Sequence, residues 1–233
     1  MPALIDDLPE QPFPGLTLIK KFPSKKNSVY LVERDDKRLV LKLYDNDRCG
    51  HEYSILKVSR NEGIAVPEPI EIQGKAMLME YVEGTLANDH VNESDMWDVV
   101  LEIASWLAVF HSTFRYGSLS LLKSDVNFKN FIVADQLYGL DFELSKPGRP
   151  EADVGEAIAY LLSTYPVFTD EKFELSRSFI ERYEEDSAIR LGDTDASVAA
   201  SLREEAEFRP SQRDILLKKA EEINSAKPFT RSL

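Results

Sequence analysis

Cysteine and histidine are scarce in this sequence, which has one cysteine, Cys49, and three histidines. A single cysteine excludes a disulfide framework within the chain and fits a reducing compartment, so we expect a cytoplasmic protein. So few thiols and imidazoles also argue against a structural zinc site.

Long hydrophobic runs are missing as well. No stretch approaches the ~20 consecutive apolar residues that cross a bilayer. The first fifteen residues hold acids and prolines instead of a basic segment followed by an apolar one. We therefore expect neither a membrane span nor a secretory leader.

Basic residues are outnumbered, because 28 Lys and Arg face 41 Asp and Glu and leave a formal charge of −13. This balance argues against a broad nucleic-acid footprint, which needs clustered cations. One local exception is the group Lys20, Lys21, Lys25 and Lys26. A length of 233 residues is enough for one or two domains with a sizeable core.

The residue pattern changes along the chain and predicts four parts. An extended arm at 1–15 precedes a small β-rich lobe at 16–83, and a larger helical lobe at 84–223 is followed by a polar tail at 224–233. The expected strands of the first lobe are 16–22, 28–33, 38–44, 70–73 and 76–82, with one helix that ends before Gly63. The expected helices of the second lobe begin near Ser94 and at 152, 171, 196 and 212, with a hairpin at 131–140.

Two charged residues interrupt the apolar pattern of the first lobe. Lys42 lies inside the strand VLKLY, and Glu52 lies near the start of the single helix. Taken alone, Lys42 is an exposed lysine on an edge strand and Glu52 a solvated helix acid, because such side chains are rarely buried without a partner.

Two further polar groups lie in the second lobe. Asp125 and Asn130 have the D-x-x-x-x-N spacing of a phosphotransferase catalytic loop, in which the carboxylate accepts a hydroxyl proton and the amide oxygen binds a metal. Asp141 follows an apolar strand and offers a carboxylate for Mg²⁺. Each of these patterns also occurs in ordinary turns.

The order of these groups is more informative than any one of them. Over residues 16–163 the sequence resembles the protein-kinase-like superfamily, through the motifs NSVYLV, VLKLY, HEYSILKVSRNEGIAVPEPI, MLMEYVEG, SDVNFKN and YGLDFELS. The resemblance implies an α+β, two-lobed fold with a small antiparallel sheet lobe that carries one helix and a larger helical lobe.

The resemblance also implies a role for each of these residues. Lys42 would bind the α- and β-phosphates of ATP and be held by Glu52, while Glu80 and Val82 would offer backbone groups to adenine. These would be the nucleotide contacts of the first lobe.

The remaining implied roles concern the reaction itself. Asp125 would orient or deprotonate the acceptor hydroxyl, and Asn130 and Asp141 would coordinate Mg²⁺. Lys123 stands where the family usually has histidine, and its ammonium would either neutralise the transferred phosphoryl group or be exposed.

The phosphate loop departs from the family because residues 23–27 contain no glycine. Side chains of Lys25, Lys26, Asn27 and Ser28 would have to replace the backbone contacts of a glycine-rich loop. A solvated run of charges is the alternative for the two lysines.

Several features indicate the branch of the superfamily. The sequence has DFE where protein kinases have DFG, and only 11 residues separate Asp141 from Asp153, which leaves no room for an activation loop. This resembles the aminoglycoside phosphotransferase and choline kinase relatives. We therefore expect an ATP- and Mg²⁺-dependent phosphotransferase that acts on a hydroxyl group of a small molecule.

Three questions stay open at this point. The acidic cluster at 181–186 is either a solvated helix end or a feature that favours a cationic acceptor. A compact atypical protein kinase or ATPase, similar to the RIO family or to the small kinase of the tRNA-threonylcarbamoylation complex, is an alternative function. A pseudokinase that binds nucleotide poorly is the second.

Overall fold

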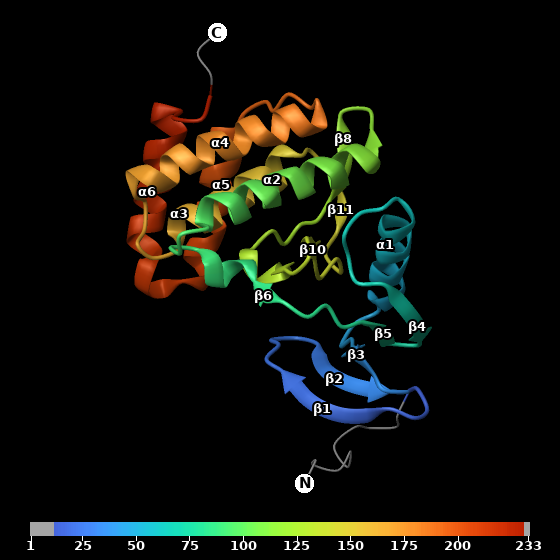
Figure 1. Ribbon diagram of the computed structural model, residues 1–233. Helices are drawn as coiled ribbons and strands as arrows, with labels where there is room; N and C mark the ends of the chain where they lie inside the picture. The colour runs from blue at the N-terminus through green and yellow to red at the C-terminus, as the bar shows by residue number, and fades with distance from the viewer. Residues whose placement is uncertain (1–11, 231–233) are drawn as a thin grey trace. The chain divides into compact units, whose positions relative to one another are not determined.

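The computed structural model describes residues 12–230, which form two compact units (Figure 1). Unit 1 contains the described residues up to Glu83 together with Leu140–Glu143, and unit 2 contains Gly84–Gly139 and the described residues from Leu144 onward. Residues 1–11 of the expected arm and 231–233 of the expected tail lie outside the described residues.

Unit 1 is built on a five-stranded antiparallel sheet with the strand order β1-β2-β3-β5-β4. Its strands are β1 (Thr17–Phe22), β2 (Ser28–Arg34), β3 (Lys37–Leu43), β4 (Pro69–Gln73) and β5 (Ala76–Glu80). Asp35 and Asp36 connect β2 to β3 with positive φ values of 52° and 58°, as a two-residue hairpin turn requires. All five strands lie where the sequence predicts them.

One helix, α1 (Cys49–Asn61), links β3 to β4 and packs on β4 and β5. Gly63 follows it with a φ of 80°, a conformation that glycine adopts at little cost and that ends the helix as predicted. The core of the sheet consists of Phe13 and Leu16, which precede β1, and of apolar side chains at alternate positions of three strands: Tyr30, Val32, Leu39, Leu41, Ala76 and Leu78.

Unit 2 is mostly helical. Its α-helices are α2 (Met96–Thr113), α3 (Glu151–Ser163), α4 (Asp170–Ser187), α5 (Thr194–Phe208) and α6 (Arg213–Ala226), and its 3-10 turns are η1 (Ala87–His90), η2 (Phe128–Asn130) and η3 (Pro210–Gln212). Two three-stranded sheets have the orders β10-β9-β6 and β11-β8-β7. Their strands are β6 (Thr85–Leu86), β7 (Arg115–Tyr116), β8 (Leu119–Leu122), β9 (Phe131–Val133), β10 (Leu137–Gly139) and β11 (Lys146–Gly148).

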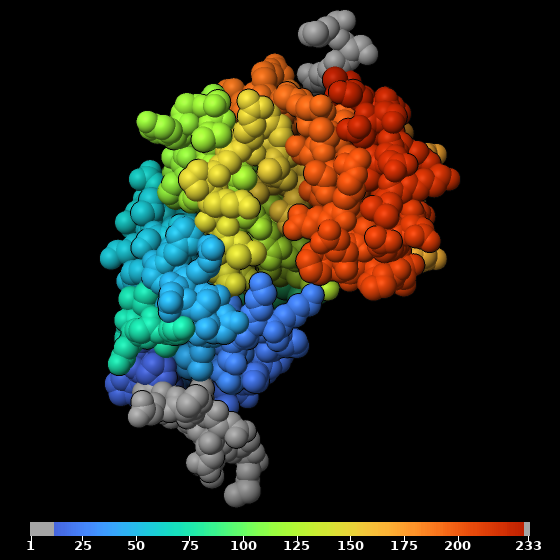
Figure 2. Space-filling view, turned by 180° about the vertical axis from the view of Figure 1, so that it is seen from behind, coloured from blue at the N-terminus to red at the C-terminus, as the bar shows by residue number. Residues whose placement is uncertain are grey.

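The helices of unit 2 pack in pairs, α2 on α4, α3 on α5 and α5 on α6. The predicted apolar stripe of α2 is buried, and within it the ring of Trp106 stacks on Phe110 with 5.2 Å between the ring centroids. Seen from behind, the C-terminal helices form the orange-to-red outer surface of this unit (Figure 2).

These elements confirm the predicted fold class, an α+β architecture with an antiparallel sheet lobe followed by a larger helical part. Strands β6, β7, β8 and β11, of two to four residues each, were not predicted from the sequence. Among residues 12–230, no helix combines the length and the apolar character that a membrane span requires.

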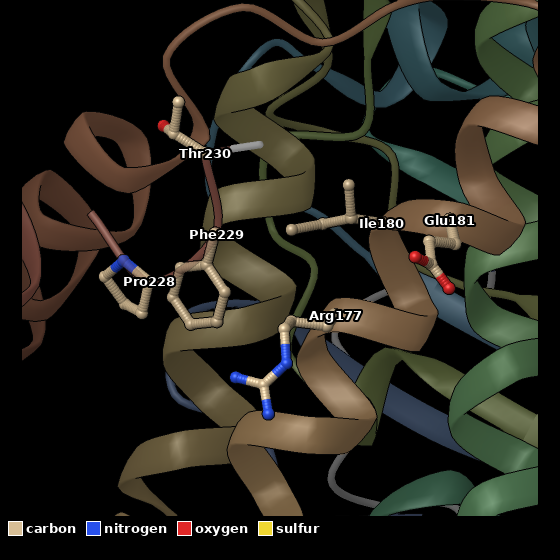
Figure 3. Close-up of a pocket in the computed structure, with 6 residues that line it drawn as sticks. All are labelled: Arg177, Ile180, Glu181, Pro228, Phe229 and Thr230. Carbon is tan, nitrogen blue, oxygen red and sulfur yellow. The ribbon is translucent and has the colours of Figure 1, made fainter. Parts of the chain in front are cut away.

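The C-terminal segment is more ordered than a polar tail from residue 224 suggests. Helix α6 runs to Ala226, and Phe229 is buried against Phe173 with the two rings stacked. The buried Asp195 accepts hydrogen bonds from the amide of Phe229 and the hydroxyl of Thr230. A small pocket borders this segment, with Arg177 and Ile180 of α4 beside the Phe229 ring (Figure 3).

Close packing of α3 on α5 depends on the absence of a side chain at Gly155. A Cβ atom there would lie 2.6 Å from the Cβ of Ser197 and 2.9 Å from the backbone nitrogen of Val198. We expect G155A to lower the free energy of unfolding by about 1–3 kcal/mol, because the two helices would have to move apart. Urea unfolding followed by circular dichroism measures this change.

The matched control is G50A in α1, where a Cβ would meet no atom within 4 Å. Alanine is the better helix former, so this variant should equal or exceed the stability of the parent chain by up to about 1 kcal/mol. Equal stability of G155A and the parent chain would show that the two helices tolerate the extra methyl group.

Candidate functional site

Lys42 is a buried cation at the centre of unit 1. It lies on β3, an inner strand between β2 and β5, and only 6% of its surface is exposed. Its Nζ is 2.7 Å from Glu52 Oε2 and 2.7 Å from Asp141 Oδ1. The exposed edge-strand interpretation of Lys42 is therefore wrong, and the structure brings together three of the residues singled out in the sequence.

The charge of Lys42 follows from its surroundings. Burial by itself would lower the pKa of the ammonium group, but the carboxylates of Glu52 and Asp141 outweigh that effect and raise it above the usual value. Lys42 is therefore a permanent cation at physiological pH. It can bind an anionic ligand without first taking up a proton.

Glu52 is the buried partner of this cation, with 1% of its surface exposed. Besides Lys42, its Oε2 accepts the hydroxyl of Tyr44 at 2.7 Å, and its Oε1 accepts the amide of Phe142 at 3.1 Å. Burial and the charge of Glu52 raise the pKa of Tyr44, so its hydroxyl remains a donor. With both oxygens engaged, Glu52 serves to hold Lys42 and the segment next to Asp141.

Three carboxylates in unit 1 suit a divalent cation. One oxygen each of Glu52, Asp141 and Glu143 lies within 4.8 Å of the others, and an all-oxygen donor set is the kind that Mg²⁺ prefers. Because both oxygens of Glu52 are engaged, Asp141 and Glu143 are the carboxylates that fit a metal. Asp141 also has a φ of 60°, a left-handed conformation that is uncommon for residues other than glycine.

Asn27, at the end of the loop between β1 and β2, is joined to this cluster. Its Nδ2 donates to Glu143 Oε2 at 2.5 Å, and its Oδ1 accepts the amide of Asp45 at 3.3 Å. Ser28 is the first residue of β2 and pairs with Leu43. The side chain of Asn27 is thus directed at a carboxylate, a contact that the sequence did not predict.

The predicted adenine contacts lie at the end of β5. The amide of Glu80 donates to the carbonyl oxygen of Glu68 at 2.9 Å, and Glu80 Oε2 accepts the amide of Glu68. Val82 lies two residues later and is buried. Nucleotide binding by these two residues stays a prediction.

Unit 2 holds the other predicted group, in the loop after β8. Asn130 donates its Nδ2 to the carbonyl oxygen of Asp125 at 3.2 Å, and Asn127 donates to Asp125 Oδ1. Lys123 is fully buried and donates its Nζ to the same carbonyl at 2.7 Å. Its ammonium therefore anchors the loop backbone, and the exposed alternative for Lys123 is wrong.

Asp153 supports this loop from the first turn of α3. Its carboxylate accepts the amides of Lys123 and Ser124, the two residues before Asp125. His111 Nε2 lies 3.0 Å from Asp153 Oδ2, and His111 Nδ1 lies 2.9 Å from the hydroxyl of Tyr183. Because an ionised carboxylate only accepts, Nε2 carries the proton shared with Asp153.

The sequence did not predict that Asp153 holds the loop before Asp125. An acid in a first helical turn is ordinary, since it favours the helix dipole, and the sequence does not indicate that Asp153 is 1% exposed. The one available signal was His111, a polar residue in line with the apolar stripe of α2. Its ring is fully buried.

A second acid on the same face of α3 also lies close to the loop. Glu156 is three residues after Asp153, and burial together with the charges of Asp153 and Asp125 raises its pKa to about 8. The backbone amide of Val126 opposes this shift. Glu156 therefore titrates near neutral pH beside the predicted catalytic aspartate.

Comparison with known proteins finds similarity to phosphotransferases in part of the chain. Residues 19–119 match the model of a family described as "Phosphotransferase enzyme family". The EKC/KEOPS complex subunit BUD32 of Encephalitozoon cuniculi is 27% identical over 139 residues, 60% of this chain. The match spans 64% of that relative, less than two thirds of its length.

Solved structures with the same fold include two kinds of small-molecule kinase. A candidate aminoglycoside phosphotransferase from Ralstonia eutropha superposes with a TM-score of 0.68 at 14% identity, covering 91% of each chain. Choline kinase from Cryptosporidium parvum gives a TM-score of 0.68 at 12% identity, covering 92% of each. The chain therefore shares its fold with these kinases, as the sequence resemblance predicted.

The raised pKa of Glu156 predicts a pH-dependent stability. The folded chain holds the proton up to about pH 8, whereas the unfolded chain releases it near pH 4.5, so the free energy of unfolding falls as the pH rises between these values. E156Q mimics the protonated carboxyl and should exceed the parent chain in stability by about 2–4 kcal/mol at high pH, with little difference near pH 4.5. Urea unfolding from pH 4.5 to 9 measures the difference.

E174Q provides the matched control, because Glu174 is exposed on α4 and the substitution removes the same charge. Its stability curve should run parallel to that of the parent chain over the whole pH range. A parallel curve for E156Q as well would show that Glu156 ionises normally in the folded chain.

Proposed function

We propose that this chain, whose fold is that of the protein-kinase-like superfamily, is an ATP- and Mg²⁺-dependent phosphotransferase that acts on a hydroxyl group of a small molecule. The observation that carries the proposal is the buried Lys42, held at 2.7 Å by both Glu52 and Asp141. A fixed cation beside oxygen ligands for a metal is what a triphosphate requires.

Unit 1 would bind the phosphoryl donor. Lys42 would contact the α- and β-phosphates, and Asp141 and Glu143 would hold Mg²⁺, with Asn130 of unit 2 as the further metal ligand that the resemblance implies. When bound, the metal would neutralise charge on the phosphate oxygens. The backbone of Glu80 and Val82 would contact adenine.

Unit 2 would supply the acceptor chemistry through Asp125. Its carboxylate would accept the proton of the acceptor hydroxyl as the oxygen attacks the γ-phosphoryl group. The hydrogen bonds from Lys123, Asn130 and the amides held by Asp153 would keep this carboxylate oriented.

A small-molecule acceptor is favoured by the short connection between Glu143 and α3. The chain forms β11 at Lys146–Gly148, which pairs with β8, and enters α3 at Glu151. Protein kinases place an activation loop with its phosphorylation site in this interval. A connection this short provides no such segment.

We also propose that the activity is cytoplasmic, because a chain with a single cysteine fits a reducing compartment.

A compact protein kinase or ATPase is the second candidate, favoured by the similarity to BUD32. The two candidates differ in the acceptor they phosphorylate. Incubation with γ-labelled ATP and Mg²⁺ would label the chain itself or an added protein for a protein kinase, and would release labelled phosphate to water for an ATPase. For a small-molecule kinase it would label only an added amino alcohol or aminoglycoside.

The nucleotide site is tested by thermal unfolding with ATP, Mg²⁺ or both. A ligand that binds only the folded chain at a hundredfold excess over its Kd adds about 2.7 kcal/mol to the free energy of unfolding. We expect ATP with Mg²⁺ to raise the Tm of the parent chain by several degrees and D141A to lose the part of the shift that requires Mg²⁺. No shift in the parent chain would favour the pseudokinase alternative.

The catalytic assignment is tested by D125N, which keeps the size of the side chain and removes its basicity. Because general base catalysis contributes about 10²–10⁴-fold, kcat should fall by at least about a hundredfold while the Kd for ATP changes little. Steady-state kinetics and equilibrium binding give the two values. D135N, at an exposed position, is the control, and undiminished turnover by D125N would exclude Asp125 as the base.

A further inference from the structure

The loop between β1 and β2 is fastened at its end by one side chain. Asn27 is buried, and it donates to Glu143 and accepts from Asp45, residues that lie 116 and 18 positions away along the chain. A solvated loop of lysines needs no such anchor. The contact therefore points to a task for Asn27 at the carboxylate cluster.

Glu143 is a buried member of the carboxylate cluster, and Asn27 is the residue that orients its side chain. Glu143 is 5% exposed, and its backbone carbonyl accepts the guanidinium of Arg48 at 3.0 Å. Lys42 Nζ lies 3.8 Å from its carboxylate, against 2.7 Å for the other two carboxylates, so the ammonium is engaged by those first. The short bond from Asn27 is what fixes Glu143 Oε2.

We propose that Asn27 is a positioning residue for metal binding, which holds the Glu143 carboxylate in place through its Nδ2 and so couples the loop at 23–27 to the metal site. The inference deepens the proposed function and rests on it. It replaces the expectation that Asn27 contacts phosphate directly.

Fixing the Glu143 carboxylate would affect metal binding because a glutamate side chain has several rotatable bonds. A neutral donor that fixes one carboxylate oxygen removes most of that freedom and leaves the other oxygen able to bind a cation. Residues that orient metal ligands in this way typically change metal affinity by about 10–100-fold when replaced. Asn27 offers an amide and no charge, so it orients Glu143 without adding a charge to the site.

The experiment measures Mn²⁺ binding to the full chain in the presence of saturating AMP-PNP, with free Mn²⁺ followed by its electron paramagnetic resonance signal. N27A should weaken Mn²⁺ binding by about tenfold or more. N27L keeps the approximate size of the side chain but removes the donor, and should weaken binding to a similar extent. N61A, at an exposed position on α1, should bind as the parent chain does.

A double variant separates positioning from direct contact. If Asn27 acts through Glu143, then N27A should cause no additional loss in an E143A background. An equal loss in both backgrounds would show that Asn27 acts on the nucleotide itself and would overturn the inference. Parent-like affinity of N27A and N27L would overturn it too.

The outcomes also distinguish this inference from the proposed function. If the parent chain does not bind Mn²⁺ with AMP-PNP, the proposed function fails and the inference with it. If the parent chain binds and N27A binds equally well, only the inference fails. Thermal unfolding of each apo variant shows whether it is folded.

Discussion

The buried ion pair of Lys42 with Glu52 and Asp141 is the interaction on which the arrangement of unit 1 depends. An ammonium with 6% exposure is costly to bury by several kcal/mol unless carboxylates surround it. The partners come from three places, β3, α1 and the segment Leu140–Glu143. Lys42 thus links Asp141 to the sheet and to α1, which explains why a segment that comes after β10 in the sequence belongs to the unit of the N-terminal sheet.

Unit 2 shows the same principle with the signs reversed. Asp153 is 1% exposed, and its charge is balanced by two loop amides and the imidazole of His111. Asp125 is half-buried, with one carboxylate oxygen bonded to Asn127. The two aspartates of this region thus differ in burial: Asp153 holds the loop, and Asp125 is the more exposed one, as the proposed base would have to be.

The sequence predicted those parts of the molecule that depend on local patterns. The strands and helices have clear periodicities, and Lys42 stood out because it breaks an apolar strand. Asn27 and Glu143 form a pair across 116 residues, and no local pattern in either segment indicates its partner. Asp153 and Phe229 were missed for the same reason, since their burial depends on helices that pack against them only in the folded chain.

The charges around Lys42 constrain the ligand more closely than any single contact does. Three carboxylates and one ammonium leave a local charge of 1 − 3 = −2, in a region of low exposure where electrostatic interactions are poorly screened. A bare triphosphate entering this region would meet that excess of negative charge. A divalent cation would cancel it, so under the proposed function the site would favour a nucleotide that arrives with its metal. A residue that fixes one of the carboxylates would then also affect how well the nucleotide binds.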